Sequence, residues 1–93
     1  MTIRVVLADD QPLVRGGFAV FVNAAPDMTV VGEAGDGQRA VDLARSERAD
    51  VVVMDIRMPT LDGLAATRRL TAELPDVRVL ILTTFEVDEY VFR

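Results

Sequence analysis

Short apolar runs alternate along this chain with longer segments whose apolar residues recur every three or four positions. The apolar runs are rich in β-branched residues, so we predict strands over 3–8, 28–34, 51–55 and 77–82. Apolar and polar residues do not alternate within these runs, which is typical of parallel strands covered on both faces. The pattern therefore predicts buried strands of a parallel sheet.

Helical spacing fills the segments between the predicted strands. The first helix is predicted from Pro12 until Pro26 ends the pattern. The second follows the turn at 35–37, the third ends before Pro75, and acidic residues from Glu86 suit the first turn of a fourth. Aromatic residues at helical spacing are predicted to lie in the core: Phe18, Phe21 and Phe92.

The order of these elements predicts the fold. Strands and helices alternate with short connections, which indicates right-handed crossovers and an α/β doubly wound parallel sheet of four strands with flanking helices. A chain of 93 residues forms one domain, and no linker or repeat divides it. Ligands of such sheets bind beyond the carboxyl ends of the strands, where the strand order reverses. Functional residues are therefore expected just after strands.

Composition excludes several classes of site. The sequence has no cysteine and no histidine, which rules out disulfides, zinc sites and histidine-dependent catalytic triads. The formal net charge is −5 without a basic run, so we expect no direct contact with nucleic acid. No apolar run approaches the ~20 residues that cross a bilayer, and Asp9 follows Met1 too closely for a signal peptide. We therefore expect no membrane contact and a cytoplasmic location.

Four oxygen-bearing side chains stand at the predicted strand ends. Asp9 and Asp10 follow the first strand, Asp55 ends the third, and Thr83 follows the fourth. Clustered carboxylates repel one another unless a cation or a proton neutralises them, and an all-oxygen set suits Mg²⁺ or Mn²⁺. Mg²⁺ leaves one acid free to act as a nucleophile. The pattern therefore favours phosphoryl transfer.

These residues resemble the receiver domain of two-component response regulators across the whole chain. The resemblance rests on Asp9-Asp10, on the run 55–63 (Asp-Ile-Arg-Met-Pro-Thr-Leu-Asp-Gly) and on Thr83, in that order at the strand ends. The stretch 82–91 looks most like the LuxR/NarL-type subfamily. The resemblance implies a flavodoxin-like fold and a phosphoprotein that takes its phosphoryl group from a sensor histidine kinase. It also implies an output, transcription, carried by a domain outside this chain.

The resemblance assigns a metal site to the acidic residues. Asp10 and Asp55 would bind Mg²⁺ directly, and Asp9 would bind it directly or through water. The backbone carbonyl of Arg57 would supply a further ligand. Asp62 is close in sequence, but Asp-Gly is a common turn pair, so we expect it to form a turn and leave it out of the site.

The resemblance also assigns a phosphoacceptor and its surroundings. Asp55 would form the aspartyl phosphate, and Thr83 would hydrogen-bond a phosphoryl oxygen and report its presence. Thr84 would control access to the site. Pro59 and Gly63 would shape the loop that exposes Asp55.

The family pattern extends further than this sequence. It includes a fifth strand with an aromatic residue and a following lysine, whereas all ten basic residues here are arginines. We therefore expect 1–93 to be a receiver domain truncated before its last strand and helix, with no DNA-binding domain. The strand at 77–82 would then be an exposed apolar edge, which predicts self-association through that strand or through a swapped C-terminal segment.

Two other functions stay open. A non-phosphorylatable fragment could keep the acids and serve only to dimerise or to bind a partner. A Mg²⁺-dependent phosphatase of the haloacid dehalogenase type would place its acids as Asp-x-Asp, whereas Asp9 and Asp10 are adjacent. The leading hypothesis is a phosphoacceptor that is no enzyme beyond its own phosphorylation and dephosphorylation.

Overall fold

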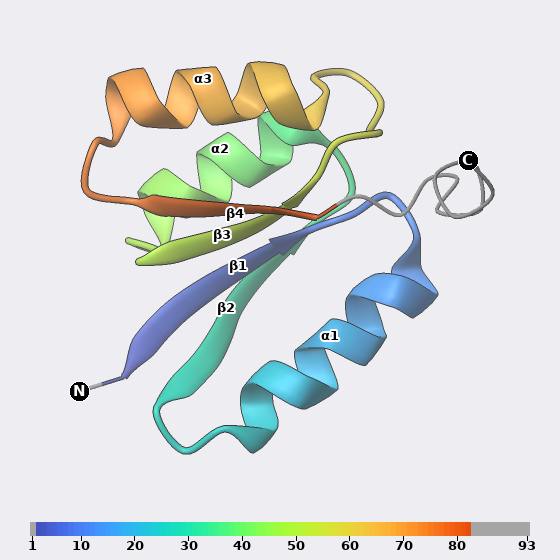
Figure 1. Ribbon diagram of the computed structural model, residues 1–93, viewed down its shortest axis with the longest axis vertical. Coiled ribbons are helices and arrows are strands. Elements are labelled where there is room, and N and C mark those ends of the chain that lie inside the picture. The colour runs from blue at the N-terminus through green and yellow to red at the C-terminus, as the bar shows by residue number, and fades with distance from the viewer. Residues whose placement is uncertain (1, 83–93) are drawn as a thin grey trace, which may run out of the picture.

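Helices and strands alternate along the chain in the computed structural model, which describes residues 2–82 (Figure 1). The predicted helix near Glu86 lies outside the described residues. None of the described helices is both long and apolar enough to cross a bilayer. The strands are β1 (Ile3–Ala8), β2 (Met28–Ala34), β3 (Val51–Asp55) and β4 (Arg78–Leu82), and the helices are α1 (Pro12–Ala24), α2 (Gly37–Ser46) and α3 (Gly63–Glu73).

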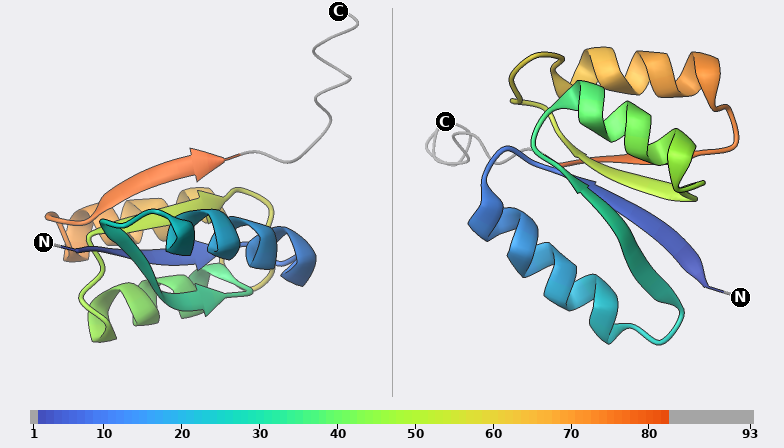
Figure 2. Two further views of the ribbon diagram at one scale, coloured as in Figure 1. Left: turned by 90° about the horizontal axis from the view of Figure 1, so that it is seen from below. Right: turned by 180° about the vertical axis from the view of Figure 1, so that it is seen from behind.

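The four strands form one parallel sheet in the order β2-β1-β3-β4. The strand order reverses between β1 and β3. After β1 the chain crosses toward one edge of the sheet to form β2, and after β3 it crosses toward the other edge to form β4. α1 covers one face of the sheet, and α2 and α3 cover the other (Figure 2). The predicted doubly wound α/β fold is confirmed, and the ends of β1 and β3 lie side by side.

The main core lies between the sheet and the pair α2 and α3. Side chains alternate between the two faces of a strand, so every second residue of β1 and β3 points into this core. α3 contributes Ala66 and Leu70, which are fully buried. The buried cluster consists of Val6, Ala8, Ala34, Ala40, Val41, Leu43, Ala44, Ala49, Val52, Met54, Met58, Ala66 and Leu70.

α1 packs against β1 and β2, and none of its residues is buried. Phe21 is 78% exposed, and Leu13 and Val20 are also largely exposed. The prediction that Phe21 is a core residue is wrong, because a single helix on a sheet buries only the side chains that face the strands. Phe18 is partly buried, and Phe92 lies outside the described residues.

β4 forms one edge of the described sheet and pairs only with β3. Leu80 is 55% exposed and Ile81 is 38% exposed. An apolar edge strand presents unpaired backbone groups to other chains. The apolar edge predicted from the sequence is therefore present within residues 2–82.

Two glycines allow backbone segments to approach closely beside the end of β3. A Cβ at Gly63 would lie 2.0 Å from the carbonyl oxygen of Asp55, and a Cβ at Gly37 would lie 1.9 Å from that of Leu61. The N–H of Gly63 also donates to the carbonyl of Ile56 at 2.8 Å. The start of α3 is therefore packed directly against the end of β3.

Replacing Gly63 with alanine is expected to lower the free energy of unfolding by about 1–3 kcal/mol, because the added methyl group would overlap the β3 backbone. Gly17→Ala is the matched control, since nothing lies within 4 Å of a Cβ at that position. Alanine there should stabilise α1 by roughly 0.5–1 kcal/mol. Urea unfolding compares the two variants, and an unchanged stability of Gly63→Ala would contradict the close packing.

Candidate functional site

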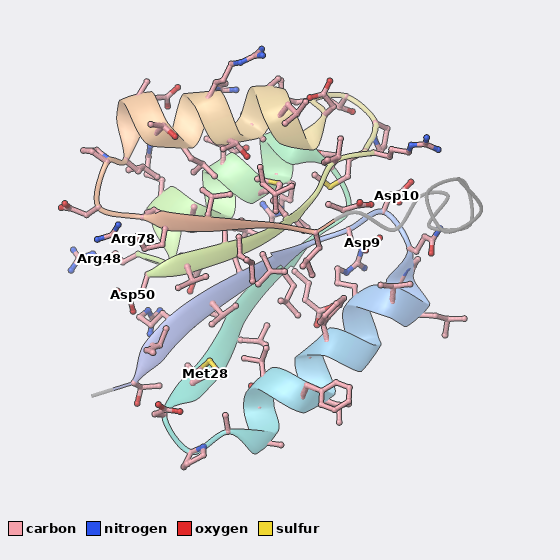
Figure 3. The ribbon with its side chains drawn as sticks, in the orientation of Figure 1. Asp9, Asp10, Met28, Arg48, Asp50 and Arg78 are labelled. Atoms are coloured by element: carbon pink, nitrogen blue, oxygen red, sulfur yellow. The ribbon has the colours of Figure 1, made fainter. Side chains whose placement is uncertain are left out.

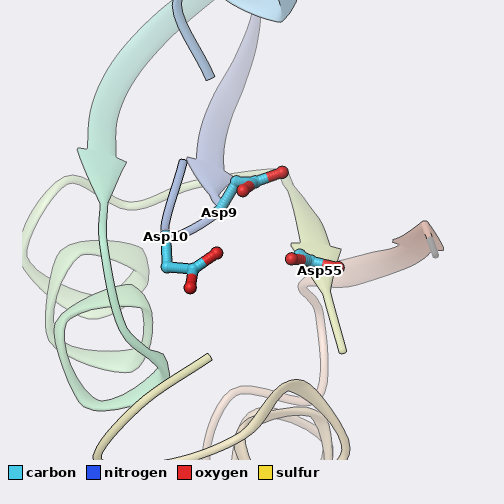
Figure 4. A group of neighbouring side chains, drawn as sticks. All are labelled: Asp9, Asp10 and Asp55. Carbon is cyan, nitrogen blue, oxygen red and sulfur yellow. The ribbon is translucent and has the colours of Figure 1, made fainter. Parts of the chain in front are cut away.

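Three aspartates converge at the carboxyl ends of β1 and β3. Asp9 and Asp10 follow β1, and Asp55 is the last residue of β3. One carboxylate oxygen from each lies within 4.8 Å of the others, and the three side chains border a common space (Figure 4). The structure thus brings together the aspartates that the sequence placed at strand ends. Their role as metal ligands stays a prediction.

Charged groups at the opposite end of the sheet are separate from this cluster. Figure 3 shows Arg48, Asp50 and Arg78 there, with Asp9 and Asp10 at the far end. Asp50 is engaged locally, since its Oδ2 accepts a hydrogen bond from the backbone N–H of Arg4 at 2.8 Å. The cluster of Asp9, Asp10 and Asp55 therefore gives one end of the sheet its acidic character.

Asp9 is held at its backbone and its side chain. Its N–H donates to the carbonyl of Ala34 at 3.0 Å, and its Oδ1 accepts from the N–H of Gln11 at 2.9 Å. Its carbonyl accepts from Nη1 of Arg15 at 2.7 Å. Sequence reasoning missed Arg15, and the only signal was a basic residue in the first turn of the helix that follows the acids.

Asp55 is a recessed carboxylate, only 4% exposed, and its Oδ1 has no hydrogen-bond partner among the described residues. Burial, followed by the negative charge of Asp9, raises the pKa of Asp55. The backbone N–H groups of Ile56 and Arg57 oppose that rise, and Asp10 adds to it. The expectation that the next loop exposes Asp55 is wrong, because this residue still belongs to β3, which has a strand on each side.

The loop between β3 and α3 borders the cluster. Arg57 and Asp10 line the same open depression, which is where the resemblance places the carbonyl ligand. Asp62 lines it too, but its Oδ1 accepts from the N–H of Ala65 at 2.8 Å and caps α3. The expected Asp-Gly turn is therefore a helix start, since Gly63 is the first residue of α3. Asp62 does not belong to the cluster of three carboxylates.

Thr83 and Thr84 lie outside the described residues. The last described residue, Leu82, pairs with Asp55 in the register of β3 and β4. The chain thus leaves β4 level with Asp55. The roles predicted for both threonines stay predictions.

The donor set fits a hard divalent cation. Three carboxylates lie together without a histidine or cysteine in the sequence, and such oxygen ligands suit Mg²⁺ and Mn²⁺. Arg15 does not neutralise them directly, because it donates to the Asp9 backbone and to Glu33. A bound cation would satisfy the buried Oδ1 of Asp55, which otherwise keeps an uncompensated desolvation cost.

The doubly wound sheet and its acidic end define a receiver-type α/β domain. The sequence profile described as "Response regulator receiver domain" matches residues 5–93. The chain belongs to this family.

Curated relatives share this segment and differ in length. The chain is 52% identical over 91 residues to the transcriptional regulatory protein YxjL of Bacillus subtilis, covering 98% of this chain and 42% of that protein. It is 44% identical to LiaR of the same organism, covering 97% and 43%. It is 46% identical to protein-glutamate methylesterase/protein-glutamine glutaminase 4 of Myxococcus xanthus, covering 92% and 24%. The chain therefore spans less than half the length of these relatives.

Solved structures with the same fold include LuxR- and NarL-type proteins. A LuxR-family response regulator from Aurantimonas sp. superposes with a TM-score of 0.85 at 35% identity, covering 99% of this chain and 66% of that one. The receiver domain of NarL from Mycobacterium tuberculosis gives a TM-score of 0.86 at 33% identity, covering 98% and 73%. The family resemblance read from the sequence is confirmed.

Asp55→Asn is expected to raise the melting temperature of the metal-free protein by several degrees at pH 7. The pKa of Asp55 is raised by folding, so the folded chain binds this proton more tightly than the unfolded chain does. Stability should therefore fall as pH rises through the interval from the ordinary carboxyl pKa to the raised one. The advantage of asparagine should shrink as pH falls toward about 4.

Circular dichroism melts in EDTA from acidic to neutral pH measure this difference. Asp76→Asn, at an exposed position before β4, is the control and should change stability little. A lower melting temperature for Asp55→Asn than for the protein without substitutions at pH 7 would contradict this prediction. It would show that burial and the charge of Asp9 do not destabilise the Asp55 carboxylate.

Proposed function

We propose that this chain is the phosphoacceptor receiver domain of a two-component response regulator, in which Asp55 takes a phosphoryl group from a sensor histidine kinase. The observation that carries the proposal is the buried carboxylate of Asp55, without a partner for Oδ1, beside Asp9 and Asp10. Phosphoryl transfer depends mainly on positioning and on neutralising charge. A fixed carboxylate in an oxygen-rich cation site meets both needs.

Asp10, Asp55 and the carbonyl of Arg57 would hold Mg²⁺, with Asp9 bound directly or through water, and Mn²⁺ could replace it. The cation would neutralise charge on the phosphoryl oxygens. A carboxylate oxygen of Asp55 forms the new bond to phosphorus while the bond from phosphorus to the donor histidine nitrogen breaks. Hydrogen bonds hold Asp9 in place, so Asp9 does not have to be reoriented when the phosphoryl group reaches Asp55.

Two threonines complete the proposed site. Thr83 directly follows Leu82, which pairs with Asp55, and this register supports a hydrogen bond from its hydroxyl to a phosphoryl oxygen. Thr84 would control access of water to the aspartyl phosphate, and thereby its lifetime.

The output of the whole protein is proposed from its relatives. The same segment matches two transcriptional regulators and a methylesterase, so we infer that the output function lies outside the shared region. Transcription is the proposed output for two reasons. This chain covers a smaller part of the methylesterase than of the transcriptional regulators, and the similar solved structures include a LuxR-family protein. The segment itself is proposed to be cytoplasmic, to act as a phosphoacceptor rather than an enzyme, and to make no direct contact with nucleic acid or membrane.

Incubation with Mg²⁺ and acetyl phosphate or phosphoramidate is expected to add one labile phosphate to the chain, which intact mass spectrometry detects. Asp55→Asn keeps the shape of the side chain but lacks the nucleophile, so this variant should not be phosphorylated. The protein without substitutions should not be phosphorylated in EDTA either. An adduct on the Asp55→Asn protein would show that another residue is the acceptor.

Two further assays, beryllofluoride binding and hydrolysis of a phosphate ester, separate the alternatives. No adduct, together with no Mg²⁺-dependent binding of beryllofluoride, would favour a fragment that only associates with itself or a partner. Steady release of phosphate from a simple phosphate ester would instead favour the haloacid-dehalogenase-type phosphatase.

Self-association is a second proposed property, and the exposed edge at β4 supports it. Leu80→Lys places a charge on the edge strand and is expected to shift the chain toward monomer in light scattering over a concentration series. Val20→Lys is the matched control, since Val20 is also exposed but lies on α1. A monomer at every concentration would contradict self-association, and loss caused only by Val20→Lys would move the interface to α1.

A further inference from the structure

Arg15 joins three elements beside the acidic cluster. It lies in the first turn of α1, and its Nη1 donates to the carbonyl of Asp9 at 2.7 Å. Its Nε donates to Oε1 of Glu33, on β2, at 3.0 Å. The side chain of Arg15 is only 20% exposed and lines a small cavity together with Asp9 and Asp55. Arg15 therefore ties the loop after β1 to both α1 and β2.

The bond from Arg15 fixes more than Asp9. The carbonyl of Asp9 and the N–H of Asp10 belong to one rigid peptide plane, so holding that carbonyl orients the plane from which Asp10 extends. Asp10 is exposed, and among residues 2–82 it makes no hydrogen bond of its own. By holding this peptide, Arg15 restricts the positions from which the Asp10 side chain can extend toward Asp55.

We propose that Arg15 is a positioning residue of the metal site, which holds the Asp9–Asp10 peptide so that both carboxylates face Asp55. This inference rests on the proposed Mg²⁺ site and adds a residue that neither the sequence pattern nor the acidic cluster identifies. Arginine suits the role because its planar fork offers donors in fixed relative directions to two acceptors on different elements. Glu33 sets the orientation of the fork and offsets its positive charge.

A substitution that removes the charge of Arg15 tests this role, because positioning and charge predict opposite changes in Mg²⁺ affinity. Arg15→Met keeps an apolar stem but removes the positive charge and both hydrogen bonds. Coulomb's law alone predicts that losing a positive charge beside a cation site tightens Mg²⁺ binding. Positioning predicts the opposite, and residues that orient metal ligands typically contribute roughly 10–100-fold to affinity. We expect Mg²⁺ binding to weaken about tenfold.

Arg69 supplies a matched control on α3. Its Nε donates to Glu73 at 3.1 Å and its Nη1 donates to Gln38, on α2, at 2.6 Å, so it makes the same kind of two-acceptor contact. Arg69 lines neither the small cavity beside Asp9 and Asp55 nor the open depression beside Asp10. Arg69→Met should therefore change Mg²⁺ affinity less than about twofold, as expected for a residue that shares no partner with the three aspartates.

Isothermal titration with Mg²⁺ measures affinity for the unmodified chain, Arg15→Met and Arg69→Met. Amide hydrogen exchange in EDTA then reports on the loop without metal, where Arg15→Met should speed exchange at the N–H groups of Asp9 and Gln11, and Arg69→Met should not. If Arg15→Met unfolds, Arg15→Lys serves as a milder variant. It keeps the positive charge but loses the planar fork, so Mg²⁺ binding should weaken in part.

The outcomes distinguish this proposal from the proposed function. Tighter or unchanged Mg²⁺ binding in Arg15→Met, or unchanged exchange at Asp9 and Gln11, would overturn the role of Arg15 while leaving the metal site intact. No Mg²⁺ binding by the unmodified chain would overturn both.

Discussion

Mutual repulsion among three carboxylates is the constraint on which the rest of this structure depends. Two unit charges about 4 Å apart near a protein surface repel by on the order of 4 kcal/mol, a large share of the stability of a small domain. The fold must therefore hold Asp9, Asp10 and Asp55 together against their own charge. It does so with the paired strands β1 and β3, a core of alanine, valine, leucine and methionine side chains, and close backbone contact at Gly63.

The elements and the location of the site could be predicted because they follow from strong local signals. Uninterrupted apolar runs indicated a parallel sheet, and acids directly after those runs had to lie at its carboxyl end. The convergence of Asp9, Asp10 and Asp55 follows from strand direction and order alone.

Other features depend on tertiary contacts that periodicity does not encode. Phe21 fits a helical pattern as well as Phe18 does, yet it is exposed because burial depends on which elements lie beside α1. Asp62 had the sequence of a turn but caps α3, because the next glycine allows the helix to begin against β3. Arg15 carried no motif signal, since its partners lie on separate elements.

The proposed function requires that Asp9, Asp10 and Asp55 form a single divalent cation site. Substoichiometric Mn²⁺, a paramagnetic substitute for Mg²⁺, can be added while the amide resonances of the chain are recorded by NMR. If these aspartates form one site, broadening should be confined to residues around Asp9, Asp10 and Asp55 and should be reversed by excess Mg²⁺. Resonances near Asp50 and Arg78 should stay sharp. Broadening spread over exposed carboxylates across the surface, or centred away from the ends of β1 and β3, would contradict it.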